Sequence, residues 1–135
     1  MTSKYFKIYE LVPEHIYKRL GEKAWKLLNP NMIKTIDAIK ERFPEGTMTI
    51  NNYHWNGNRN WSGLRTPGSP EYSETSQHSL GNAFDAVFSA YTAEEVRVYV
   101  IANPKEFPYL KGIETNISWF HGDVRNTDNI ELFNK

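Results

Sequence analysis

A single carboxylate stands inside a short apolar run, and a histidine precedes it on the same stretch. Residues 76–88 read SQHSLGNAFDAVF and contain His78 and Asp85. In a strand, alternate side chains point to opposite faces, so Ala83, Asp85 and Val87 share one face. Because an unpaired buried carboxylate is costly, Asp85 requires a cation, a hydrogen-bond network or a metal ion.

The metal hypothesis must use histidine, carboxylate or backbone oxygen, because the 135-residue chain contains no cysteine. Fully extended, His78 and Asp85 would stand about 23 Å apart at roughly 3.3 Å per residue, so a turn at Gly81 must bring them together. A third ligand can come from His121, in a second strand-like segment. Histidine, aspartate and histidine with an open fourth position suit catalytic zinc, and the alternative is a structural His–Asp pair.

The same stretch carries a recognisable motif. The pattern Ser-x-His-x-x-Gly-x-Ala-x-Asp is matched at every fixed position, by Ser76, His78, Gly81, Ala83 and Asp85. This pattern resembles the M15 family of zinc peptidases, which includes D-Ala-D-Ala carboxypeptidases, D-Ala-D-Ala dipeptidases and phage L-alanyl-D-glutamate endopeptidases. The segments YFKIYELV, SGLR and WFHGDVR are similar to the small phage and prophage branch, so the resemblance spans about residues 5–125.

The resemblance implies a zinc-dependent hydrolase of the bacterial cell wall, cutting the peptidoglycan stem peptide or cross-bridge as a phage-type endolysin. It implies Zn²⁺ bound by His78, Asp85 and His121, with Arg65 as a catalytic cation that holds substrate or transition-state oxygens. The expected substrate contacts are Arg65, Ser76, Trp61 and Tyr72. For the aromatic residues of this group, the alternative is that they attach a long loop to the core.

The general base does not follow from the motif. Many M15 enzymes carry an acidic residue three positions before the last histidine, and here that position is Ser118. Asp123 is the first candidate, because it shares a strand face with His121. Its alternatives are an ion pair with its neighbour Arg125, a hydrogen bond to a metal-bound histidine, or service as a ligand in place of His121. Glu114 is the second candidate for the base.

Composition predicts one soluble domain over residues 1–135. Sixteen Lys and Arg balance 16 Asp and Glu, which gives no electrostatic reason to expect nucleic acid or membrane partners. The charged N-terminus has no signal-peptide pattern, and no run of apolar residues is long enough to span a membrane. We expect a monomer that is made in the cytoplasm and reaches the wall as a released lysin or with a phage particle.

Periodicity predicts an α+β fold with a small antiparallel sheet and N-terminal helices, and the resemblance adds the zinc fold of hedgehog and D-Ala-D-Ala peptidases. Residues 10–46 read as two helices, 47–55 and 83–88 as strands, 92–107 as a helix and 112–125 as a strand or hairpin. Residues 56–81, rich in Gly, Asn, Ser and Pro, read as an ordered functional loop. The alternative to an enzyme is an inactive zinc-containing protein that binds wall peptides or belongs to the virion structure.

Overall fold

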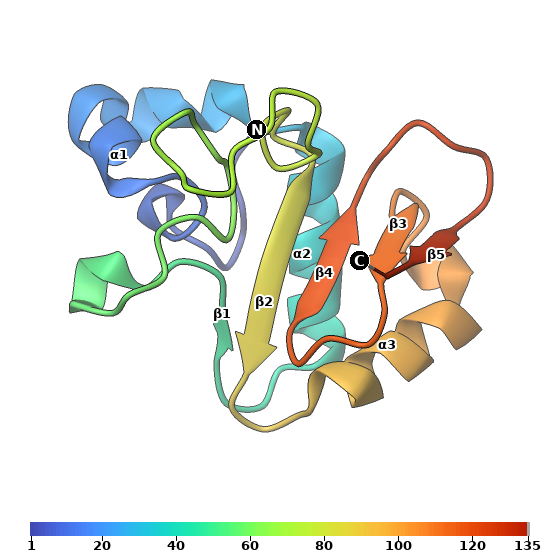
Figure 1. Ribbon diagram of the computed structural model, residues 1–135. Coiled ribbons are helices and arrows are strands. Elements are labelled where there is room, and N and C mark those ends of the chain that lie inside the picture. Colours follow the sequence, from blue (N-terminus) through green and yellow to red (C-terminus); the bar gives the residue numbers. More distant parts are fainter. Residues whose placement is uncertain (135) are drawn as a thin grey trace.

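The computed structural model describes residues 1–134, which form an α+β fold (Figure 1). The α-helices of this part of the chain are α1 (Glu14–Leu20), α2 (Pro30–Arg42) and α3 (Ala93–Ala102). Its strands are β1 (Met48–Thr49), β2 (Ala83–Phe88), β3 (Gly112–Glu114), β4 (Phe120–Asp123) and β5 (Glu131–Phe133). Short 3₁₀ helices are η1 (Ile8–Glu10), η2 (Gly21–Leu27), η3 (Tyr53–Trp55) and η4 (Pro104–Glu106). The predicted α+β class is confirmed.

The strands form one sheet in the order β1-β2-β4-β3-β5. Neighbouring strands are antiparallel except for β3 and β5, which are parallel. The expected hairpin is present as β3 and β4, whereas the predicted strand over 47–55 is reduced to β1 followed by η3. The sheet therefore places β2 beside β4, and these two strands carry Asp85 and His121.

The helical N-terminal segment differs from the prediction of two continuous helices. The first helix stops at Gly21, whose φ of 54° lies in the left-handed region. A residue in that conformation ends an α-helix, and the chain continues as η2 instead. The second helix begins as expected, because the Asn29 side chain accepts a hydrogen bond from the backbone N–H of Asn31.

The core lies between the sheet and α2, which runs behind β2 and β4 in Figure 1. Phe84 on β2 and Phe120 on β4 are fully buried and stack with ring centroids 5.9 Å apart. Ile33 and Ile36 of α2 belong to the same buried cluster. With these neighbours on one face of the sheet, strand alternation sends Asp85 to the other face.

Residues 56–81 contain no helix or strand, but backbone hydrogen bonds connect them to the rest of the fold. The backbone N–H of Leu64 donates to Leu11, and that of Asp85 donates to Ser62 at 2.7 Å. This loop therefore lies against β2, where its side chains border the face that carries Asp85. No helix in the described part of the chain is both long enough and apolar enough to cross a membrane.

Candidate metal centre

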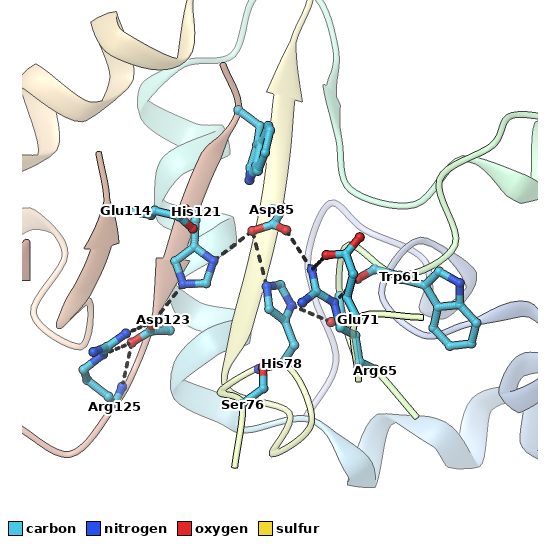
Figure 2. Close-up of polar contacts among 12 residues, drawn as sticks. Trp61, Arg65, Glu71, Ser76, His78, Asp85, Glu114, His121, Asp123 and Arg125 are labelled. Atoms are coloured by element: carbon cyan, nitrogen blue, oxygen red, sulfur yellow. Dashed lines mark hydrogen bonds and ion pairs between the residues drawn. The ribbon is translucent and has the colours of Figure 1, made fainter. Parts of the chain in front are cut away.

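The structure brings His78, Asp85 and His121 together (Figure 2). In the β2–β4 ladder Asp85 lies directly opposite His121. His78 approaches from the loop, which turns back at Gly81 with a left-handed φ of 74°. Asp85 Oδ1 lies 2.8 Å from His121 Nδ1 and 3.3 Å from His78 Nε2. One ligand atom from each buried side chain thus faces a common point.

The hydrogen bonds of His78 determine which ring nitrogen is free. Its Nδ1 lies 2.8 Å from the carbonyl oxygen of Gly63, which can only accept, so Nδ1 carries the proton. In the neutral ring Nε2 then holds a lone pair directed at Asp85. Nε2 is buried and has no hydrogen-bond partner. Its 3.3 Å contact with Asp85 Oδ1 lacks the alignment of a hydrogen bond, so a metal ion between the two atoms would satisfy the lone pairs of both.

His121 is oriented in the same way by a carboxylate. Its Nε2 lies 2.8 Å from Asp123 Oδ2, which leaves Nδ1 to face Asp85. Asp123 is itself held by Arg125, whose Nε and Nη2 each donate to it at 2.7 Å. Carboxylate or carbonyl partners on the outer nitrogen are typical of metal-binding histidines.

The spacing of the three inward-facing atoms fits a small divalent ion. Metal–ligand bonds of about 2.0–2.1 Å in tetrahedral geometry separate ligand atoms by about 3.3 Å. The pairs that involve Asp85 Oδ1 are 2.8 and 3.3 Å apart, and all three atoms lie within 4.8 Å of one another. The buried histidine, aspartate and histidine can therefore hold a metal ion.

The shifted pKa values of Asp85, His121 and Asp123 also indicate that the site favours a bound positive charge. Burial alone would raise the pKa of Asp85, but its hydrogen bond with His121 and the proximity of His78 outweigh burial and lower it. Burial likewise opposes a charged His121, yet the bonds to Asp123 and Asp85 raise its pKa to about 9. For Asp123, burial is outweighed by Arg125 and His121, and the pKa falls to about 2. Without a metal, a proton on His121 supplies the cation that the two carboxylates need.

Arg65 contacts the second oxygen of Asp85. Its Nη2 lies 3.2 Å from Asp85 Oδ2, and its Nε donates to the carbonyl of Trp61 at 2.9 Å. A weaker contact of 3.8 Å joins Arg65 to the exposed Glu71. Asp85 is thus shared between a fixed guanidinium on one oxygen and the two histidines on the other.

A cleft of about 790 Å³ opens over these residues. Among the residues predicted to contact substrate, those that line the cleft are Arg65, Ser76 and Trp61. Tyr72 is exposed and is not among the residues that line the cleft, and its contact with substrate stays a prediction. Its neighbour in the loop, Glu71, faces the cleft instead.

The two candidates for the general base occupy different environments. Asp123 shares a strand face with His121, but it is fully buried, does not line the cleft, and has both oxygens bound by Arg125 and His121. Glu114 does line the cleft, and no hydrogen bond or ion pair to its carboxylate occurs within residues 1–134. The β3–β4 register, continued by one residue, places Glu114 beside His121, as Figure 2 shows. The exposure to the cleft thus favours Glu114 over Asp123 as the candidate base.

One contributor was not visible in the sequence. The backbone carbonyl of Gly63 determines the tautomer of His78. Because every residue has a backbone carbonyl, the residue type at this position does not indicate that role.

Comparison with known proteins adds no relative: no family model matches the chain, and neither the curated proteins nor the solved structures contain a match.

Proposed function

We propose that this protein is a zinc-dependent peptidase that hydrolyses a peptide bond of peptidoglycan. The observation that carries the proposal is the pair of histidines whose outer nitrogens are bound, by Gly63 and Asp123, and whose inner nitrogens face one carboxylate oxygen. Two neutral imidazoles and one carboxylate leave a divalent ion with net positive charge and an open position. That donor set is typical of catalytic zinc, and structural zinc sites are usually closed by four protein ligands.

The surrounding residues supply the remaining parts of a hydrolytic site. Bound zinc would contribute Lewis-acid polarisation of the scissile carbonyl and a lowered pKa for water. Arg65 directs a guanidinium toward the cleft, where it would stabilise the developing oxyanion. Glu114 would take the proton of the attacking water and pass it to the leaving amine. Asp123 would hold His121 in the tautomer that binds metal.

The substrate class comes from the motif. The resemblance to M15 peptidases points to the D-amino-acid-containing peptides of the bacterial wall, and the cleft is open enough for a peptide chain. We therefore propose a phage-type lysin, active on the wall either after release from an infected cell or from a phage particle.

A second candidate is a zinc-containing protein that binds wall peptides, or supports a virion, without turnover. Ser118 favours this alternative, because it stands where many family members carry their base. Glu114 argues against it, since its carboxylate lines the cleft and makes no hydrogen bond or ion pair within residues 1–134.

Digestion of purified peptidoglycan distinguishes the two candidates. The zinc-loaded protein should release muropeptides whose masses identify the cleaved bond, and a chelator should abolish the release until zinc is restored. Asp85→Asn is the matched inactive variant, because it removes a ligand charge and keeps the side-chain shape. If zinc binds at one equivalent and no peptide bond is cut, the non-enzymatic alternative is supported.

A further inference from the structure

The connection between β3 and β4 forms a wall of the candidate active site. Residues 115–119 contain no helix or strand, and Asn116 adopts a left-handed φ of 60°. Ile117 and Trp119 line the cleft over the metal centre. Ile117 also lines a second hollow of about 360 Å³ on the other side of the connection. An irregular segment with open space on both sides requires something to fix its position.

Arg97 of α3 holds residues 114–119 in place. Its side chain is buried, and its guanidinium reaches three backbone carbonyls of the segment 114–119. Nη2 donates to Ile117 at 2.8 Å, and Nη1 donates to Trp119 at 2.9 Å and to Glu114 at 3.3 Å. The remaining Nε–H donates to the exposed Glu94 at 2.9 Å. One side chain thus binds the segment at its start, its middle and its end.

The planar guanidinium is suited to this task. Its donors lie in a fixed fork, so three carbonyls that bind it are held at set positions relative to one another. A lysine ammonium would carry the same charge on a flexible stem without that geometry. One of the carbonyls belongs to Glu114, at the end of β3, so Arg97 adds a contact at the point where the chain leaves the β3–β5 ladder.

We propose that Arg97 is a positioning residue, which fixes the 114–119 segment and thereby holds the Glu114 carboxylate in the cleft. The inference rests on the proposed function in one respect, the role of Glu114 as base. The positions of the three metal ligands should not change when Arg97 is replaced, because the β2–β4 ladder and the turn at Gly81 hold them.

The first test is independent of activity. Backbone ¹⁵N relaxation of Arg97→Lys should show the order parameters of residues 115–119 falling from about 0.85 to below about 0.6, with β2 unchanged. Glu94→Gln is the matched control, since it alters the ion pair and keeps the carbonyl contacts, and its segment should stay rigid. In the native protein, the Arg97 Nη protons should be resolved and rotate slowly. A rigid segment in the folded lysine variant, or freely rotating Nη groups in the native protein, overturns the proposal.

The second test is a double-mutant cycle on wall-peptide hydrolysis. Arg97→Lys should lower kcat at least tenfold at unchanged zinc content, and it should cause no further loss in a Glu114→Gln background. Equal losses in both backgrounds would mean that Arg97 acts on stability or on another group, which refutes the positioning role. A native protein that binds zinc and cuts nothing would overturn the proposed function, whereas the relaxation experiment still decides whether Arg97 holds the segment.

Discussion

Replacing Asp123 by asparagine should weaken metal binding and leave the chemistry largely intact. The carboxylate accepts from His121 on one side and from Arg125 on the other. Oδ2 accepts from His121 Nε2 and from Arg125 Nη2, and Oδ1 accepts from Arg125 Nε. An asparagine amide has one acceptor oxygen and one donor nitrogen, so it cannot accept at both positions. If its nitrogen faces His121, it donates to Nε2 and moves the ring proton to Nδ1, the atom that should bind the metal. If its oxygen faces His121, its nitrogen opposes the Arg125 guanidinium.

One orientation of the asparagine amide thus opposes the metal-binding tautomer of His121, and the other keeps that tautomer at the cost of the contact with Arg125. Partners of this kind are typically worth about 10- to 100-fold in metal affinity, or about 1.4–2.7 kcal/mol. We therefore expect zinc affinity to fall by that factor in competition titrations against a chromophoric chelator. At saturating zinc, wall-peptide hydrolysis should stay within about tenfold of the native rate, since the group does not reach the cleft.

Comparing Asp123→Asn with Glu114→Gln, in both zinc affinity and hydrolysis rate, can contradict this prediction. A positioned acid–base group is worth roughly 10²–10⁴ in rate, so the glutamine variant should lose that much and keep its zinc. The opposite pattern would contradict the geometry: if Asp123→Asn binds zinc normally and loses the rate, Asp123 is the base after all. If both variants retain full activity, neither carboxylate transfers the proton.

Other perturbations test the remaining parts of the site. Arg65→Lys should keep the fold and lower turnover by up to about 10²-fold, because an ammonium cannot contact both Asp85 and an oxyanion; equal activity would leave Arg65 a structural role. His78→Ala should abolish stoichiometric zinc binding and lower the free energy of unfolding of the metal-free protein by about 1–3 kcal/mol in urea titrations, since the Gly63 carbonyl then loses the buried donor Nδ1–H. In the metal-free protein the pKa of His121 is raised from 6.5 to about 9, so its stabilisation is complete below about pH 6.5 and disappears as the pH rises through 9. Urea titrations at pH 6, 8 and 10 should show this loss without zinc and a smaller one with zinc, which replaces the proton.

Local patterns in the sequence were sufficient to predict those parts of the fold that depend on residues close together in the chain. Alternation in 83–88 places Asp85 opposite the core-facing Phe84, and the helix predicted to begin at residue 92 has Thr92 as its N-cap, because the Thr92 and Glu95 side chains form a capping box. The break after the first helix was missed. Gly21 is compatible with a helix interior or with its end, and only packing of the following η2 against the core decides between them.

The candidate site, like the fold, was predictable from the sequence only in part. Residue types and the motif identified His78, Asp85 and His121 as a possible ligand set, because few side chains bind metals and their spacing follows the motif. The assignment of roles to Asp123 and Glu114 required the tertiary structure. Both are carboxylates near His121, and burial, strand register and the competing Arg125 determine which one faces the cleft. Sequence thus specifies which groups are available, whereas their proton positions and exposure depend on contacts between residues far apart in the chain, such as the Gly63 carbonyl with His78 and Arg97 with the β3–β4 connection.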